Sequence, residues 1–193
     1  MKQIRQIIIL EYRSEWKDEF AAIEHALRSA LGALALRIDH IGSTAAPGLP
    51  AKDIIDVQVT VGDFMPGIEA ALLKAGYPRR VDITRDHQPP GAAGNDRDWE
   101  KQYYQSTPDL RLAHVHVRRA GSANGRYALL FRDYVRSHSL AAEAYARTKK
   151  APAAHGATDW DLYYDVKDPV CDIIMAGAAE WAAATSWRVE HYT

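Results

Sequence analysis

The chain has little cysteine, and this shortage excludes two kinds of structure. Its single cysteine, Cys171, lies in an apolar stretch. One thiol cannot form an internal disulfide or a cysteine-based zinc site, so we interpret Cys171 as a small buried residue. A chain without disulfides is typical of the reducing cytosol, and we therefore expect a cytoplasmic protein.

Net charge is also nearly absent. The 24 Lys and Arg residues oppose 25 Asp and Glu residues, which leaves a formal charge of −1. A chain with this balance has no overall field that would attract nucleic acid or an anionic membrane. We therefore expect neither as a partner, and any site for an anion has to be local.

Long apolar runs are missing as well. Near the start, only the four residues 7–10 are contiguous and apolar before Glu11, which is too short for a signal-peptide core or a membrane span. This stretch predicts a leading β-strand instead. The Gly-x-x-x-x-Gly-Lys-Ser/Thr loop of P-loop kinases is absent too, so no ATP site of that kind is expected.

What is present is the composition of an ordinary globular protein. The 193 residues are 47% hydrophobic and 25% charged, which supplies enough apolar material for one core. We predict a single domain over residues 1–193.

Periodic apolar residues predict several helices. Apolar side chains recur at steps of three or four between Ser14 and Gly32, which predicts a helix with Ser14 as its N-cap and Gly32 as its stop. A second helix is predicted from Asp63, its N-cap, to Gly76. The last third of the chain reads as helical over residues 127–138, 140–149 and 160–185, with a break at Asp168-Pro169.

Alternating residues predict strands in the first two thirds. The clearest strand covers residues 54–61, with aliphatic side chains on one face and Asp56, Gln58 and Thr60 on the other. Residues 86–98 contain prolines and glycines without periodicity, which predicts a mobile loop. Further strands are predicted over residues 34–41, 81–83, 99–105 and 110–118. The fold class is therefore α+β, with a mixed β-sheet and a helical C-terminal third.

One segment carries most of the functional information. A predicted strand ends in Gly42-Ser43, and the next predicted strand carries Asp56. Glycine lets a backbone approach a phosphate closely, and the amides and hydroxyls that follow can donate to its oxygens. A carboxylate on the neighbouring strand could then hold a divalent cation such as Mg²⁺ that bridges the phosphates. This arrangement is typical of a nucleotidyltransferase site.

The same segment resembles the GrpB family. The family's signature is matched by His-Ile-Gly-Ser-Thr at residues 40–44, Pro-Gly-Leu at 47–49, Ala-Lys at 51–52 and Ile-Asp at 55–56. The likeness continues through the His-Val-His-Val run at 114–117 and the C-terminal third, so it covers nearly the whole chain. It is similar above all to the GrpB-like domain at the C-terminus of some bacterial dephospho-CoA kinases, so a bacterial source is expected.

The resemblance implies a nucleotidyltransferase-like fold. Within that fold, Gly42 and Ser43 match the Gly-Ser turn that binds phosphate. Asp56 matches the first carboxylate of the strand, which makes it the candidate catalytic residue and the candidate ligand of a metal.

The chain departs from the full nucleotidyltransferase pattern at two places. Gln58 occupies the position of the second carboxylate, and His114 and His116 stand where a later acid is expected. A neutral amide lacks the charge of a carboxylate, and Mg²⁺ prefers charged oxygen ligands to imidazole. These departures count against ordinary transfer chemistry with two metal ions.

The candidate substrate-binding residues include cations near the family motifs. Cations suit an anionic ligand, and hydroxyls, amides and imidazoles can donate to its oxygens. The candidates are Gly42, Ser43, Thr44, Lys52, Gln58, His114, His116, Arg132 and Lys149.

Each candidate also has a structural interpretation that the sequence leaves open. The hydroxyls of the Gly-Ser-Thr run could simply close a turn, and Asp56 could be paired with Lys52 or an arginine. Arg132 could form a surface pair with Asp133. His40 is better interpreted as a structural histidine. Tyr103, Tyr104 and Tyr127 could stack on a base, but aromatic residues in such elements usually fill the core.

Two functions from different classes remain. In the first, a nucleotidyltransferase-like cleft binds a nucleotide or another small phosphorylated ligand, either as an enzyme or as the inactive relative of one. In the second, the chain is a non-catalytic module that contacts a protein partner or assists folding. Gln58 favours the second function, whereas the Gly-Ser turn, Asp56 and the paired histidines favour the first.

Overall fold

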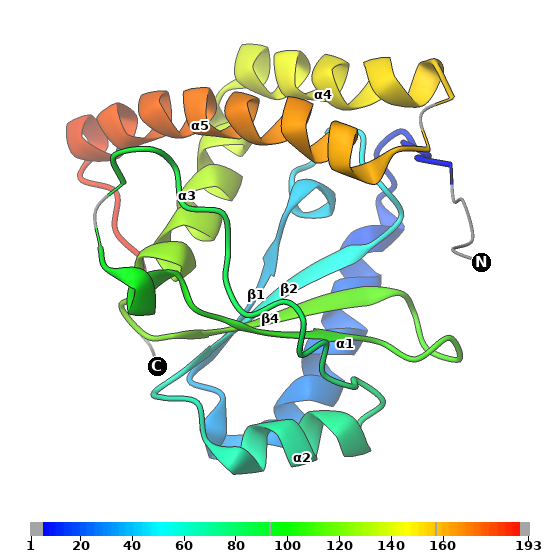
Figure 1. Cartoon of the computed structure of the whole chain (residues 1–193), viewed down its shortest axis with the longest axis vertical. Coiled ribbons are helices and arrows are strands. Elements are labelled where there is room, and N and C mark those ends of the chain that lie inside the picture. The colour runs from blue at the N-terminus through cyan, green and yellow to red at the C-terminus, as the bar shows by residue number, and fades with distance from the viewer. Residues whose placement is uncertain (1–5, 93, 157, 190–193) are drawn as a thin grey trace.

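The computed structural model describes residues 6–92, 94–156 and 158–189 and shows a four-stranded sheet with helices on both faces (Figure 1). The strands are β1 (Arg37–Ile41), β2 (Ile55–Val61), β3 (Gln102–Gln105) and β4 (Ala113–Arg119). The helices are α1 (Glu15–Leu31), α2 (Pro66–Lys74), α3 (Ala123–Ser137), α4 (Ser139–Ala154) and α5 (Trp160–Thr185). The predicted α+β fold, with a mixed sheet and a helical C-terminal third, is confirmed.

The central strands of the sheet bring the candidate site residues together. The strand order is β1-β2-β4-β3, in which β2 and β4 run parallel and the two outer strands are antiparallel to their neighbours. The register places Asp56 opposite His114 and Gln58 opposite His116. Because side chains alternate between the faces of a strand, all four side chains project from the same face of the sheet.

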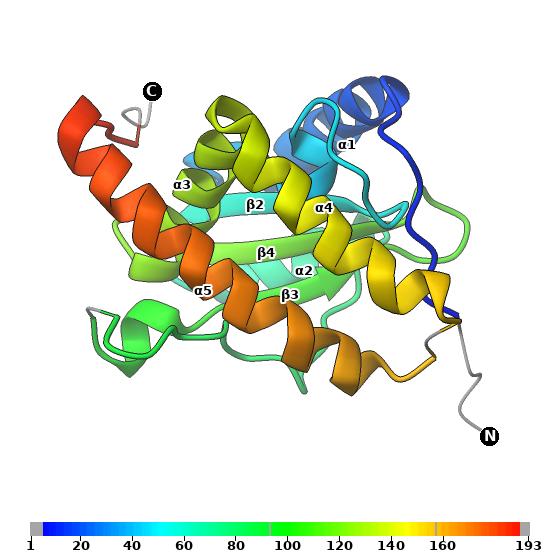
Figure 2. The same cartoon turned by 90° about the horizontal axis from the view of Figure 1, so that it is seen from above.

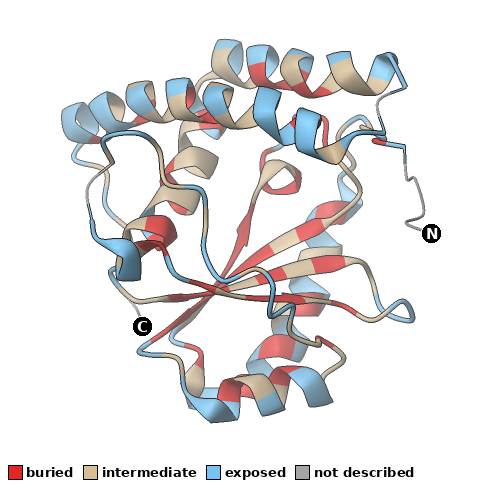
Figure 3. Ribbon diagram, in the orientation of Figure 1, coloured by how far each residue is buried: buried red, intermediate tan, exposed pale blue. Residues whose placement is uncertain are grey.

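The other face of β2 builds the main core. Its residues Ile55, Val57, Val59 and Val61 are at most 1% exposed and pack in one cluster with apolar side chains of α1 and α2. Figure 3 shows the buried residues concentrated along the strands and on the inward sides of the helices. This alternation confirms the strand predicted over residues 54–61.

Helices α3, α4 and α5 lie over the polar face of the sheet (Figures 1 and 2). They pack mainly against one another and form two further hydrophobic clusters, one of which includes Ala46 and Leu49 from the segment between β1 and β2. The polar face of β2 is therefore enclosed between the sheet and this helical layer. In the part of the chain that is described, no helix is both long and apolar enough to cross a membrane.

Two predicted strands are wrong. Residues 6–9 have no regular structure, and Leu10 makes only an isolated bridge to Ala51, while residues 1–5 lie outside the described residues. Residues 81–83 form a turn between isolated bridges of Arg79 and Arg85 to the segment around β3. In the described structure, neither stretch pairs with a neighbouring strand beyond these isolated bridges.

Two predicted helix boundaries are also wrong. Asp63 does not cap α2, which begins at Pro66; its carboxylate instead accepts a hydrogen bond from the Arg119 guanidinium, 2.6 Å away. Helix α5 has no break at Asp168-Pro169 and continues through the proline. Its packing against α3 and α4 supports the continuous helix, although the proline removes one backbone hydrogen bond.

The segment predicted as a mobile loop has fixed points at both ends. Residues Asp96–Trp99 form a short 3₁₀ helix with Asn95 as its cap, and Asp86 is held by three side chains described below. Ala93 lies outside the described residues. Mobility of the intervening residues stays a prediction.

Candidate functional site

A cavity of about 640 Å³ lies between the polar face of the sheet and the helical layer. Its lining contains eight of the residues predicted as site residues from the sequence: Gly42, Ser43, Thr44, Lys52, Asp56, His114, His116 and Lys149. The other two candidates, Gln58 and Arg132, are not among its lining residues.

The Gly42-Ser43 turn forms one wall, and only glycine fits at its first position. Gly42 has φ of 71°, a conformation that residues with a side chain rarely adopt. A Cβ atom there would lie 2.5 Å from Oδ2 of Asp56. The turn therefore approaches the Asp56 carboxylate as closely as backbone can, and Ser43 follows at the start of a short 3₁₀ helix.

The Asp56 carboxylate is held by the two histidines of β4. Its Oδ1 atom lies 3.5 Å from Nδ1 of His114 and 3.6 Å from Nε2 of His116. Burial alone would raise the pKa of Asp56, but the two histidines beside the carboxylate outweigh that effect and hold the pKa well below its usual range. Asp56 is thus an anion at any physiological pH.

His116 is an uncharged link in a larger network. Burial lowers its pKa to about 4, and the ammonium of Lys101 acts in the same direction. Its Nδ1 atom lies 3.4 Å from Nζ of Lys101 and 3.5 Å from Nη2 of Arg118. Both neighbours are donors, so Nδ1 accepts and the ring proton is on Nε2, facing Asp56.

Asp86 is the centre of this network, and sequence reasoning missed it. Its carboxylate accepts hydrogen bonds from Lys101 at 2.7 Å, from Arg118 at 2.9 and 3.0 Å, and from Asn124 at 3.0 Å. Burial would raise the pKa of Asp86, but the two cations outweigh it and hold the pKa well below the usual range. A signal was available, because Arg118 shares the enclosed face of β4 with the histidines and a buried arginine needs a carboxylate.

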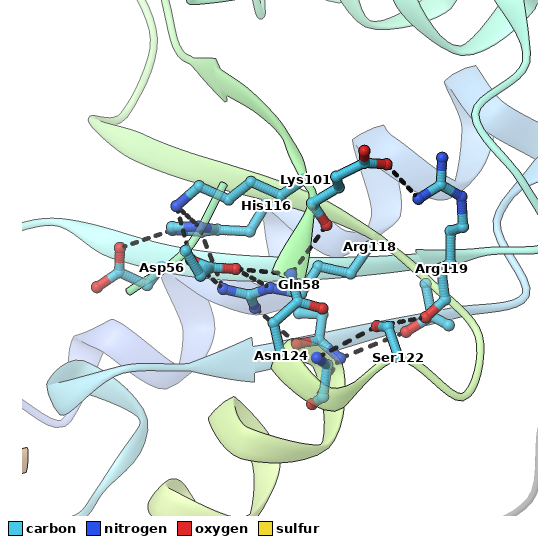
Figure 4. Close-up of polar contacts among 12 residues, drawn as sticks. Asp56, Gln58, Lys101, His116, Arg118, Arg119, Ser122 and Asn124 are labelled. Atoms are coloured by element: carbon cyan, nitrogen blue, oxygen red, sulfur yellow. Dashed lines mark hydrogen bonds and ion pairs between the residues drawn. The ribbon is translucent and has the colours of Figure 1, made fainter. Parts of the chain in front are cut away.

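Gln58 serves the network rather than the cavity (Figure 4). Its side chain is 1% exposed, and its Oε1 atom accepts a hydrogen bond of 2.7 Å from Nη1 of Arg118. Its amide donates to the Thr60 hydroxyl and the Gly125 carbonyl, each at 3.4 Å. The position of the second carboxylate is therefore filled by an amide whose partners are a guanidinium and neutral oxygens.

This donor set suits a divalent metal poorly. Among the described residues, Asp56 is the only carboxylate within 4.0 Å of either histidine of the pair, and Lys101 and Arg118 place two positive charges within reach of His116. Over the described ranges, no group of three His, Cys, Asp or Glu side chains is placed to hold a metal ion. Mg²⁺ at Asp56 stays a prediction, and we derive no chemical step through it.

Lys149 faces the turn from the helical layer. Its side chain is 2% exposed, and Nζ lies 2.8 Å from Oγ of Ser43 and also donates to the carbonyl of Pro50. Within the described part of the chain, no carboxylate lies within 4.0 Å of this nitrogen. Burial lowers the pKa of Lys149 to about 7.

Lys52 is surrounded by aromatic rings of α5. Its Nζ atom lies 4.8 Å from the ring centroid of Trp160 and 5.2 Å from those of Tyr163 and Tyr164. Such cation–π contacts hold an ammonium without neutralising it. Lys52, and Lys149 in its protonated form, therefore bring positive charge to the cavity without a carboxylate partner among the described residues.

Arg132 and His40 have structural contacts away from the cavity. Arg132 donates to the carbonyl of His40 at 3.1 Å and to Asp133 at 2.7 Å, which ties α3 to β1. Nε2 of His40 lies 2.9 Å from the Thr44 hydroxyl, and its ring stacks on Phe20. Of the three tyrosines considered for stacking, Tyr103 and Tyr127 line the cavity. Tyr104 is fully buried in the main core.

The lining of the cavity is rich in positive charge. Six cationic side chains line it: Lys52, Arg85, Lys101, Arg118, Lys149 and Lys167. The three carboxylates that line it are Asp56, Asp86 and Asp168. The whole chain, by contrast, has a formal charge of −1. The local anion site expected from the sequence thus has a counterpart in this cavity.

Comparison with known proteins places the chain in a family. The family described as GrpB protein matches residues 6–176. A dephospho-CoA kinase of Mycolicibacterium paratuberculosis is 36% identical over 188 residues, which are 90% of this chain and 46% of that protein. The chain thus spans about half the length of the relatives that carry this name.

Two further relatives match over most of their own length. A UPF0157 protein of Halalkalibacterium halodurans is 32% identical over 178 residues, which cover 89% of this chain and 82% of that protein. The crystal structure of the conserved protein GrpB from Enterococcus faecalis superimposes with a TM-score of 0.71 at 28% identity, over 90% of this chain and 98% of that one. The matched sequence and the shared architecture agree, and the chain belongs to the GrpB family.

Proposed function

We propose that the cavity binds a nucleotide or another small phosphorylated ligand in a nucleotidyltransferase-like arrangement. The observation that carries this proposal is the pair of ammonium groups, Lys52 and Lys149, that reach the cavity without a carboxylate partner in the described structure. Lys149 is buried, at 2% exposed, and a buried ammonium without a counter-ion is costly. A bound phosphate would supply the missing negative charge.

The neighbouring groups suit a phosphate in the same place. Gly42 leaves its backbone uncovered, and the Ser43 hydroxyl lies beside the Lys149 ammonium. Tyr103 and Tyr127, which line the cavity, provide apolar surface for a base or another planar group. Asp56, an acceptor, would bind a hydroxyl or amino group of the ligand rather than its phosphate.

A second function has a specific observation in its favour. The chain matches about half of several proteins named dephospho-CoA kinase, so related sequences occur joined to another segment. The alternative proposal is a non-catalytic module that contacts a protein partner or assists folding. Under this alternative the cavity residues would affect stability but not binding of a phosphorylated compound.

Calorimetric titration separates the two proposals. The protein is titrated with ATP, GTP, CTP, UTP, dephospho-CoA and inorganic phosphate, and the same compounds are tested by thermal shift. A compound at about 100 times its dissociation constant should stabilise the fold by roughly 2.7 kcal/mol. Lys149→Met should weaken binding at least about 10-fold, because each ammonium–phosphate contact is charge-assisted.

A matched control uses an exposed lysine. Lys17 lies on the outer side of α1, so Lys17→Met removes the same charge far from the cavity and should leave binding unchanged. Absence of heat and of thermal shift with all six compounds would contradict the ligand-binding proposal and favour the module.

A further inference from the structure

We propose that His114 is a nucleophile that accepts a nucleotidyl group on its Nε2 atom. This inference rests on the proposed function, because it requires a phosphorylated ligand in the cavity. It names a reaction that proceeds without a divalent metal, for which the donors around Asp56 are poorly suited.

The geometry assigns different roles to the two nitrogens of His114. Nδ1 lies 3.5 Å from Oδ1 of Asp56, its register neighbour on β2. A proton on Nδ1 is shared with that carboxylate, which leaves the lone pair on Nε2. His114 lines the cavity with 22% of its side chain exposed, and over the described residues Nε2 has no partner.

The neighbouring histidine cannot take this role. Nε2 of His116 faces Asp56 at 3.6 Å, and its Nδ1 accepts from Lys101 and Arg118, so both nitrogens are occupied. Its side chain is also less exposed, at 14%. His116 is a positioning residue: it holds the Asp56 oxygen that orients His114.

The chemical step balances without a metal or an external base. The lone pair of Nε2 attacks the phosphorus atom of a nucleoside triphosphate, and an N–P bond forms. The P–O bond to pyrophosphate breaks, and its electron pair leaves with the pyrophosphate oxygen. The imidazole ring becomes cationic, and the Asp56 carboxylate beside Nδ1 stabilises that charge.

The second half of the reaction restores the enzyme. Water, or a hydroxyl group of an acceptor, attacks phosphorus, the N–P bond breaks, and its electron pair returns to Nε2. The proton of the attacking group passes to solvent. The charge that builds on the phosphate oxygens is balanced by Lys52 and Lys149, which reach the cavity without carboxylate partners in the described structure. The reaction class is hydrolysis or transfer at a phosphate through a histidine adduct.

The adduct can be detected directly. The full chain is incubated in EDTA with ATP, GTP, CTP or UTP labelled at the α-phosphate, and binding of each nucleotide is measured in the same buffer. A phosphoramidate is stable in alkali and labile in acid, which distinguishes it from an ester of serine. We expect such a label, and peptide mass spectrometry should locate it on His114.

Three variants test the assigned roles. His114→Asn keeps a donor for Asp56 at the position of Nδ1 but removes the nucleophile, so binding should persist and the label should vanish. His25→Asn, at an exposed position of α1, should label like the wild type. Asp56→Asn should slow labelling at saturating nucleotide by roughly 100-fold, beyond any change in the dissociation constant, as expected of a residue that orients the nucleophile.

The possible failures are distinct. Nucleotide binding without an acid-labile label overturns this inference and leaves the proposed function standing. A label that persists in His114→Asn, or that maps to His116, also overturns it. No binding of any of the four nucleotides overturns both the inference and the nucleotide form of the proposed function.

Discussion

Asp86 holds two buried cations in place, and its replacement by asparagine should be strongly destabilising. Arg118 and Lys101 are 5% and 9% exposed, and each has Asp86 as its carboxylate within 4.0 Å in the described part of the chain. Asparagine is nearly isosteric but neutral, and its amide group would face the donors of Arg118, Lys101 and Asn124.

The expected magnitude follows from this geometry. Removing one partner of a buried ion pair costs about 3–5 kcal/mol, because the remaining charge stays buried without compensation. The total stability of a domain is about 5–15 kcal/mol, so Asp86→Asn should remove about a fifth of it or more. Urea denaturation followed by circular dichroism at neutral pH measures the change.

Gln58→Glu provides an internal control for this reasoning. In the wild type the new carboxylate loses the amide hydrogen bonds to Gly125 and Thr60, which should cost about 1–3 kcal/mol. In the Asp86→Asn background the same carboxylate lies where Oε1 accepts from Arg118 at 2.7 Å, so it should restore part of the lost stability. Gln6→Glu, at an exposed position, should neither destabilise the wild type nor stabilise Asp86→Asn.

A change of sign between the two backgrounds is the decisive result. Loss of less than about 1 kcal/mol in Asp86→Asn would show that the network carries little energy. If Gln58→Glu lowers the free energy of unfolding equally in both backgrounds, the uncompensated charge on Arg118 does not account for the instability of Asp86→Asn.

Three further predictions concern the turn, Lys149 and acid stability. Gly42→Ala should lower the free energy of unfolding by at least about 2 kcal/mol and abolish ligand binding, because the new Cβ would lie 2.5 Å from Oδ2 of Asp56 at a positive φ. Unchanged binding would contradict the close approach of the turn to Asp56. Burial lowers the pKa of Lys149 to about 7 in the folded state, so the unfolded chain binds more protons between about pH 7 and 10, and the wild type should gain stability over that range relative to Lys149→Met. Asp86 has a folded pKa below its unfolded value, so its contribution is present above about pH 4 and is lost as the pH falls through the folded value. The difference in free energy of unfolding between wild type and Asp86→Asn should therefore be smaller at pH 2 than at pH 7. An equal difference at both pH values would refute the role assigned to the Asp86 carboxylate.

Local patterns predicted the parts of the site that lie on strands. Period-two alternation placed Asp56 and Gln58 on the polar face of β2, and the same reasoning placed His114 and His116 on one face of β4. The parallel register then brings these side chains together without any further information. A shift of one residue would have turned them all into the main core.

Contacts between distant segments could not be predicted in this way. Asp86 follows a turn without periodicity, and its position under Arg118 depends on how that turn packs. The rings around Lys52 come from α5, more than 100 positions along the chain. They face Lys52 only because of the way α5 is rotated about its own axis as it packs over the sheet. No local pattern records either relation.

The division of the apolar side chains into separate clusters bears on how the molecule is assembled. The main core lies within residues 16–117 and joins one face of the sheet to α1 and α2. Helices α3, α4 and α5 belong to two other clusters, and the cavity lies between them and the polar face of the sheet. The two layers therefore have separate cores, and the cavity exists only where the two layers meet. A phosphorylated molecule held by Asp56 from below and Lys149 from above would join the two layers, so its binding should slow amide hydrogen exchange more in α4 and α5 than in the strands.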